Sequence, residues 1–364
     1  MKIKFSGSVH YANGAPLANV SVRVFDQDAL GKKDDDLTVT PGISDNAGRF
    51  NLTYEPMRYL DFHSINPSTA SNEPFNTADA ESGLRLPDFG DIYLAYIQFT
   101  YTHNGRDRQH RAPLRIFQTK FLVPENPPVE FLPSLHGFHF PNKFAGYFLP
   151  FSAPAFITSS KVARNYGLCG GMCAAAYDFA LTGRIIPQTN NIPHQGTRLH
   201  RYLFQRQIDS FGGMAQQLVK VAQWTSLPDD TLMGTQSRTA DEFNTIRQKL
   251  DDKNPVILAL IYEHASSMKE LSYRIFNNHQ VLAYAYQQNA AGGFVINIYD
   301  PNLPGRDDVI IQTEPVILGV VNANIDPTTV SGLKSTQLLG GSFYVQVRGF
   351  LGMPYVPILP PKLI

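Results

Sequence analysis

The hydrophobic pattern changes along the chain, and this change constrains the fold more than any other feature. Up to about Lys120 the apolar and polar residues alternate in short runs, as in residues 20–25 and 49–54. This alternation is typical of half-buried strands. Beyond Pro150, helix-like segments come first and strand-like segments follow. We therefore predict an all-β sandwich followed by an α+β domain whose sheet is mostly antiparallel.

The length of 364 residues favours two domains, because one hydrophobic core rarely serves a chain this long. We expect a sandwich over residues 1–120, a linker or strap over 121–150 and a second domain over 151–364. The sequence Pro124-Glu125-Asn126-Pro127-Pro128 favours extended chain in the strap. Five phenylalanines indicate that the strap packs against the second domain. They are Phe131, Phe138, Phe140, Phe144 and Phe148.

Charge and composition argue against several classes of protein. The 31 basic and 31 acidic residues balance, so nothing indicates a nucleic-acid partner or a membrane-surface patch. Two cysteines cannot form a disulfide scaffold. The start of the chain lacks an apolar signal core, and no apolar run approaches membrane-spanning length. We expect a protein without cofactors, either cytoplasmic or exported without a cleaved signal peptide.

The second domain contains several readable elements. We predict helices at residues 172–181, 197–211 and 213–224. The sequence Thr239-Ala240-Asp241-Glu242 has the form of a capping box and predicts a helix that ends at Leu250. Strands are predicted at residues 256–262, 280–286, 293–299 and 342–347.

A cysteine at a Gly-rich turn is the strongest indication of function. Residues 166–176 read Tyr-Gly-Leu-Cys-Gly-Gly-Met-Cys-Ala-Ala-Ala, which places Cys169 at the start of a helix. Free N–H groups and the positive end of the helix dipole favour the thiolate, which is the nucleophile. Downstream, His279 begins one predicted strand and Asp300 follows another. Cys173 lies one turn inside the helix, and we interpret it as a buried core residue.

Two metal sites stay open as alternatives. Cys169 and Cys173 share a helix face and could bind zinc with His194 or His200, although no second ligand pair at zinc-finger spacing is present. An acidic loop near the N-terminus could bind calcium, but it lacks the pattern of a calcium loop, so we favour a solvated acidic loop. Its aspartates are Asp26, Asp28, Asp34, Asp35 and Asp36.

Motifs in the first 55 residues resemble transthyretin-like and carboxypeptidase-regulatory-like sandwiches. They are Gly7 with Val9, Gly14-Ala15-Pro16-Leu17, residues 20–26 and Ser44-Asp45-Asn46-Ala47-Gly48-Arg49-Phe50. Modules of this kind serve in adhesion, in docking or in stabilising an attached enzyme. The resemblance therefore implies a protein partner that docks on the sandwich.

Four motifs in the second domain resemble, in order and context, the papain-like cysteine peptidases. They are Leu168-Cys169-Gly170-Gly171, Asn254-Pro255-Val256-Ile257, Asn278-His279-Gln280-Val281 and Tyr299-Asp300-Pro301-Asn302. The nearest branch is the one that removes bacteriocin leader peptides, and the resemblance spans about residues 151–305. It implies that Cys169 attacks a carbonyl carbon, that His279 keeps the sulfur ionised, and that Asp300 orients the imidazole.

The resemblance departs from the family at one position. The family places a glutamine a few residues before the cysteine, where this chain has Ala163, Arg164 and Asn165. We expect the Asn165 amide to act as oxyanion donor together with the Cys169 backbone N–H.

These residues predict a cysteine-dependent hydrolase that cleaves an amide or peptide bond. Two alternatives remain. The missing glutamine favours a catalytically inactive peptide-binding protein. The sandwich and the hydrolase-like domain together are also compatible with an exported antibacterial effector that attacks cell wall or protein. The sequence does not identify the substrate.

Overall fold

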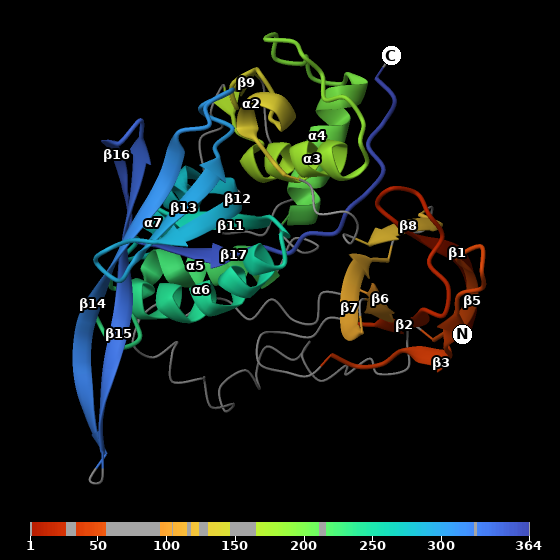
Figure 1. The fold of residues 1–364 in the computed structure, drawn as a ribbon, viewed down its shortest axis with the longest axis horizontal. Helices are drawn as coiled ribbons and strands as arrows, with labels where there is room; N and C mark the ends of the chain where they lie inside the picture. Colours follow the sequence, from red (N-terminus) through yellow and green to blue (C-terminus); the bar gives the residue numbers. More distant parts are fainter. Residues whose placement is uncertain are drawn as a thin grey trace.

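The computed structural model combines N-terminal β-sheets, a central group of helices and a C-terminal curled sheet (Figure 1). This order of strands, helices and strands confirms the mixed α and β character that the hydrophobic pattern predicts. The structure describes residues 2–26, 34–55, 95–103, 105–114, 118–123, 130–145, 165–210, 216–323 and 326–363.

Two four-stranded sheets form the N-terminal region, in the orders β3-β5-β1-β8 and β4-β2-β6-β7. Side chains from both sheets join one hydrophobic cluster, including Val9 and Phe121 from the first and Val22 and Phe99 from the second. Alternating burial along β2 and β5 confirms that each strand presents one face to this core. The strands are β1 (Ile3–Tyr11), β2 (Ser21–Phe25), β3 (Thr38–Thr40), β4 (Gly42–Ile43), β5 (Arg49–Tyr54), β6 (Tyr96–His103), β7 (Arg106–Pro113) and β8 (Lys120–Val123).

The start of the strap belongs to a sheet. Residues 121–123, assigned to the strap from the sequence, form most of β8, which pairs in parallel with β1. Burial explains this pairing, because Phe121 and Val123 enter the N-terminal cluster. The later strap forms a short helix α2 (Pro133–His136) and a strand β9 (Phe144–Ala145), which pairs with β10 (Asn165–Tyr166).

The aromatic residues of the strap are packed, as expected. Four of them are buried in the same cluster as the helix that begins at Cys169; they are Phe131, Phe138, Phe140 and Phe144. Phe148 and residues 124–129 lie outside the described ranges.

Three predicted helices agree with the structure to within a few residues, and the fourth begins earlier. The helices are α3 (Cys169–Leu181), α4 (Arg198–Ser210), α5 (Gln216–Ser226), α6 (Thr235–Asp251) and α7 (Met268–Arg274), the last followed by the 3₁₀ turn η2 (Ile275–Asn277). The capping box at Thr239 is wrong, because the N-cap of α6 is Gly234. Thr239 is buried inside α6, where its hydroxyl donates to the Thr235 carbonyl at 2.7 Å and accepts from the Phe350 N–H at 3.1 Å.

The C-terminal sheet has seven antiparallel strands in the order β16-β15-β14-β13-β12-β11-β17. The four predicted strands correspond to β11 (Val256–Ile261), β12 (His279–Gln288), β13 (Phe294–Tyr299) and β16 (Ser342–Val347). Three others were not predicted: β14 (Val309–Ala323), β15 (Asp326–Leu339) and β17 (Gly349–Gly352). The β14–β15 hairpin extends well beyond the rest of the sheet (Figure 1).

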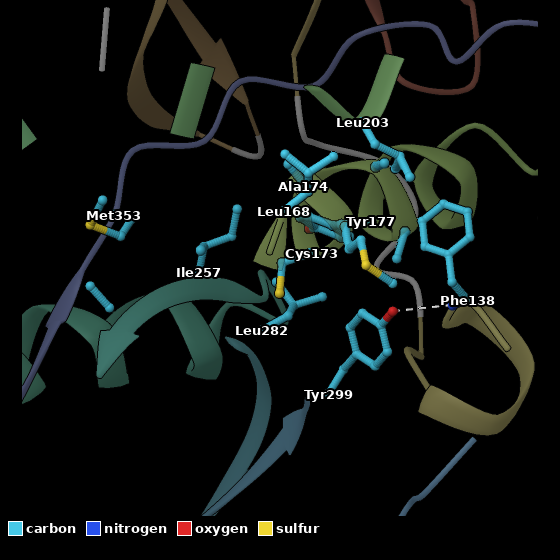
Figure 2. Close-up of a cluster of buried hydrophobic side chains, with 14 of the residues drawn as sticks. Phe138, Leu168, Cys173, Ala174, Tyr177, Leu203, Ile257, Leu282, Tyr299 and Met353 are labelled. Carbon is cyan, nitrogen blue, oxygen red and sulfur yellow. Dashed lines mark hydrogen bonds between the residues drawn. The ribbon is translucent and has the colours of Figure 1, made fainter. Parts of the chain in front are cut away.

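Strand β11, which lies between β12 and β17, is buried on both faces and so divides two hydrophobic clusters. Its odd-numbered residues from Ile257 to Ile261 join the cluster that contains α3, and its even-numbered residues from Val256 to Leu260 join the one that contains α6. This explains why its sequence is a continuous apolar run. In the first cluster, Tyr299 accepts the Phe138 N–H on its hydroxyl at 3.2 Å, which joins the strap to β13 (Figure 2).

Within the described part of the chain, no helix has both the length and the apolar character needed to cross a bilayer.

Candidate active site

Cys169 is the first residue of α3 and is partly exposed. The two glycines that follow allow this end of the helix to approach its neighbours closely. A Cβ on Gly170 would lie 1.5 Å from Oε1 of Gln280, and one on Gly171 would lie 2.1 Å from the Leu203 carbonyl oxygen. Glycine disfavours helices through its conformational freedom, so close packing accounts for both positions. Cys169 is thereby held beside β12 and α4.

Cys173 lies one turn further along α3 and is fully buried. Figure 2 shows its sulfur among Ile257, Leu282 and Tyr299. The thiol lies 3.6 Å from the Gln280 carbonyl oxygen, to which it donates a weak hydrogen bond. Burial holds the pKa of Cys173 well above its usual range. This environment suits a core residue rather than a nucleophile.

The structure brings His279 and Asp300 together at the ends of two neighbouring strands. His279 is the first residue of β12 and Asp300 directly follows β13, which pairs with β12. Nε2 of His279 donates to Oδ1 of Asp300 at 2.7 Å, and both side chains are buried. Because an ionised carboxylate only accepts, the Nε2 atom carries the proton in this bond.

Opposing effects determine the charge of His279. Burial disfavours the imidazolium, but the Asp300 carboxylate and a hydrogen bond with Cys169 outweigh it and raise the pKa of His279 to about 10. Burial likewise opposes ionisation of Asp300, yet His279 and other donors hold its pKa below the usual range. The pair is therefore ionic at neutral pH. Since Asp300 occupies Nε2, Nδ1 is the ring nitrogen left for the cysteine.

Other side chains hold the carboxylate of Asp300 in place. Its Oδ1 also accepts the backbone N–H of Asn302 at 2.8 Å, and its Oδ2 accepts from Nε2 of Gln337 at 2.7 Å. The Tyr262 hydroxyl donates to Oε1 of Gln337 at 2.7 Å, which fixes the direction of that amide. The Tyr262 ring also stacks beside His279, with centroids 6.4 Å apart. Sequence reasoning missed Gln337 and Tyr262, for which no local motif exists.

The structure leaves the predicted oxyanion donor unplaced. The backbone of Asn165 pairs with Ala145, but its side chain lies outside the described residues, as do Ala163 and Arg164. The second expected donor is the backbone N–H of Cys169. Among the residues that the structure describes, none accepts a hydrogen bond from the Cys169 N–H at the start of α3.

The zinc alternative receives no support. No group of three or more His, Cys, Asp or Glu side chains within the described ranges could hold a metal ion. His200 lies instead among aromatic rings, with centroids 5.8 Å from Phe144 and 6.4 Å from Phe204.

The acidic loop is tied to basic side chains where it is described. Asp34 accepts from Arg111 at 3.0 Å, and Asp36 pairs with Arg23 at 2.5 Å. Asp28 lies outside the described residues. These partners fit the solvated acidic loop better than a calcium site.

A surface pocket lies apart from this site. It is lined by residues of α6, β12 and β13, including Arg247, Tyr286 and Phe294, and by none of Cys169, His279 and Asp300.

No protein-family model and no curated protein matches the chain. A solved structure, that of a 9R-lipoxygenase from Cyanothece PCC8801, aligns with 93% of this chain at 12% identity and a TM-score of 0.19. The alignment covers 42% of the lipoxygenase chain, so the protein spans less than half of that length. A similarity this weak carries no argument about fold or function.

Proposed function

We propose that the protein is a cysteine-dependent hydrolase that cleaves an amide or peptide bond through a thioester. The observation that supports it most is the contact between a partly exposed cysteine at a helix start and a buried histidine paired with a buried aspartate. Cysteine hydrolases use these three roles, namely nucleophile, proton carrier and orienting acid.

The proposed fold has two units. The two N-terminal sheets share one core, which supports a transthyretin-like β-sandwich over about residues 1–120 that docks a protein partner. A helix that begins at the cysteine and packs against β12, together with an antiparallel sheet, supports a papain-like α+β domain over residues 151–364. Residues 121–150 join the two.

The reaction follows from the hydrogen bonds at the site. Because His279 is protonated, Cys169 acts as its thiolate, and the sulfur attacks the carbonyl carbon of the substrate. The imidazolium then protonates the leaving nitrogen as the carbon–nitrogen bond breaks, which leaves a thioester on the sulfur. His279 next removes a proton from water, whose oxygen attacks the thioester carbon. The carbon–sulfur bond breaks, the acid is released, and the thiolate faces the imidazolium again.

Two groups support the charges that develop. Asp300 stays ionised throughout and holds the imidazole with Nδ1 toward the sulfur. We propose the backbone N–H of Cys169 and the Asn165 amide as the two donors to the oxyanion.

A peptidyl chloromethyl ketone tests this proposal, because it alkylates an activated cysteine that binds peptide. We expect a covalent adduct on Cys169 in the parent protein and none in His279→Ala, as measured by mass spectrometry of proteolytic peptides. Cys173→Ser is the matched control and should label like the parent. If the peptide moiety binds reversibly without an adduct, the protein is a peptide-binding protein and the hydrolase proposal fails.

A further inference from the structure

One residue of the strap joins the two halves of the site. Asn142 accepts the backbone N–H of Leu168 on its Oδ1 at 2.6 Å. Its own backbone N–H donates to the Pro301 carbonyl at 3.0 Å, and its Nδ2 donates to Oδ1 of Asn302 at 3.2 Å. Leu168 directly precedes Cys169. A single asparagine therefore connects the turn that carries the nucleophile to the loop that carries the acid.

The second half of this connection reaches the catalytic pair. Asn302 donates its backbone N–H to Oδ1 of Asp300 at 2.8 Å. Its side-chain nitrogen lies 3.2 Å from Nε2 of His279, but both nitrogens carry protons, so this contact is not a hydrogen bond. Movement of Asn302 would consequently move the Asp300 carboxylate, which holds the His279 imidazole, relative to the sulfur.

The Leu168 N–H determines the orientation of the side-chain amides of both Asn142 and Asn302. The Leu168 N–H can only donate, so the Asn142 atom that contacts it must be the oxygen. Nδ2 of Asn142 then points to Asn302, and because an amide nitrogen only donates, Asn302 must present its own oxygen. Each side chain therefore has one allowed orientation, which makes the connection directional and stiff.

Gly167 makes room for this asparagine. A Cβ at Gly167 would lie 2.8 Å from Nδ2 and 3.3 Å from Oδ1 of Asn142. The backbone of Gly167 does not have a positive φ, so alanine is permitted there by conformation, and the three atoms nearest to its methyl group would all belong to Asn142. The two positions are matched in shape.

We propose that Asn142 is a positioning residue that holds Cys169 within hydrogen-bond reach of His279 by connecting Leu168 to the loop after Asp300. This inference rests on the proposed hydrolase function. The attraction between a thiolate and an imidazolium weakens with their separation, so loosening the connection should reduce the thiolate fraction at low pH.

The rate at which iodoacetamide alkylates Cys169 reports that fraction at each pH. Among the described residues, the titratable groups that face His279 are Cys169 on α3, Asp300 after β13 and Tyr262 directly after β11. Tyr344 on β16 acts on Asp300. Burial holds the pKa values of Tyr262 and Tyr344 above their usual range, so neither tyrosine ionises between pH 5 and 9.

We expect Asn142→Ala to slow alkylation of Cys169 at about pH 6 by about tenfold and to leave the rate at about pH 9 nearly unchanged. Gly167→Ala should act in the same direction, because its methyl group displaces the Asn142 amide. Asn191→Ala, at an exposed position, is the matched control and should behave like the parent. The melting temperature of each variant separates repositioning from unfolding.

The double variant gives the sharpest result. In the Asn142→Ala background the space beside Gly167 is empty, so Gly167→Ala should cause no further slowing. If the two effects multiply instead, or if folded Asn142→Ala alkylates like the parent, Asn142 does not position the nucleophile. Should Asn142→Ala fail to fold, Gly167→Ala alone decides, and a parent-like rate in that variant overturns the proposal.

The same experiment distinguishes an error in the proposed hydrolase function from an error in the role of Asn142. A parent protein whose Cys169 reacts no faster at about pH 6 than a free thiol, with a pKa of about 8.5, has no activated cysteine. A parent protein that does react, with variants that match it, contradicts only the role of Asn142.

Discussion

Asp300 illustrates, at the scale of single residues, how this site maintains a buried charge. Its two oxygens accept from His279, from the Asn302 backbone and from Gln337. A buried carboxylate is costly unless its lone pairs are satisfied, and here three donors supply them. Gln337 is itself fully buried, so no water can replace it readily.

Removing the Gln337 amide should therefore destabilise the protein. Gln337→Leu leaves Oδ2 of Asp300 without its donor and the Tyr262 hydroxyl without its acceptor. We expect a loss of about 1–3 kcal/mol in the free energy of unfolding, measured by urea denaturation, because each buried group left unsatisfied carries a cost of this order. Gln248→Leu, at an exposed position of α6, should change it little. Equal free energies of unfolding for the two variants would show that the Gln337 amide does not stabilise the fold.

The residues predicted from the sequence share one property. Cys169, His279 and Asp300 each lie beside a local pattern, a Gly-rich helix start or the end of an apolar strand, and such patterns are visible in sequence. Gln337 and Asn142 act through side-chain bonds to distant segments, and a bond of this kind leaves no local pattern. Long-range contacts of single polar residues are therefore what sequence reasoning could not supply.

At the scale of elements, tertiary contacts decide where α6 begins. The Thr239-Ala240-Asp241-Glu242 pattern satisfies the capping rule, yet the helix starts one turn earlier, at Thr235. Thr235 is buried, and its hydroxyl shares its one proton between Oδ1 of Asp229 at 2.9 Å and the Arg348 carbonyl oxygen at 2.8 Å. These contacts extend the helix beyond its local signal.

Thr239 should consequently matter as a link between α6 and β17 and not as a cap. Thr239→Val keeps the shape but leaves the buried Phe350 N–H without its acceptor. We expect a loss of about 1–3 kcal/mol in the free energy of unfolding, and a smaller loss for Thr239→Ser, which keeps the hydroxyl. Urea denaturation of both variants measures the difference. A valine variant as stable as the serine variant would contradict this link.

The long hairpin was not predicted for a related reason. Pro315 and Gly319 interrupt β14, and both residues favour turns in a sequence. In the structure Pro315 pairs with Leu333, and the register shifts between Ile317 and Gly319, so the strand tolerates both through an irregularity. Pairing with a long partner strand outweighs weak local preferences.

At the scale of the whole molecule, contacts connect the N-terminal sheets to the rest of the chain. Arg108 of β7 pairs with Asp252 at the end of α6, at 3.1 Å.

His110 of the same strand is buried, and its Nε2 has no hydrogen-bond partner among the described residues. Burial and the nearby Lys249 lower the pKa of His110 to about 4.

The C-terminal segment forms a second connection. It passes between the helices and the N-terminal sheets (Figure 1). Val356 packs against the N-terminal cluster, and its carbonyl accepts from Arg206 of α4 at 2.9 Å. Arg206 also forms a buried ion pair with Asp178 of α3, at 2.7 Å. One segment thus contacts the N-terminal core and, through Arg206, the helix that begins at Cys169.

The His110 environment predicts that stability falls in mild acid. In the unfolded chain His110 binds a proton near its ordinary pKa of about 6.5. In the folded protein it is protonated only near pH 4. The unfolded state therefore binds more protons in this window, and stability is lost as the pH falls from about 6.5 to 4, by about 3 kcal/mol. His279 does not contribute here, because its raised pKa makes its stabilisation disappear only as the pH rises toward 10.

Urea denaturation at several pH values checks this expectation. His110→Gln should flatten the dependence between pH 6.5 and 4, while His194→Gln, at an exposed position, should leave it as in the parent. An unchanged slope in His110→Gln would mean that other groups cause the acid sensitivity.

The most direct test of a Cys169–His279 pair is the rate of iodoacetamide alkylation at about pH 5.5, read residue by residue by mass spectrometry. A free thiol, with a pKa of about 8.5, is almost unreactive at this pH. We predict that the folded parent labels at Cys169 and not at Cys173, and that folded His279→Ala labels Cys169 at least about tenfold more slowly. Equal rates in the two proteins, or labelling of Cys173 first, would contradict the pair and with it the proposed hydrolase.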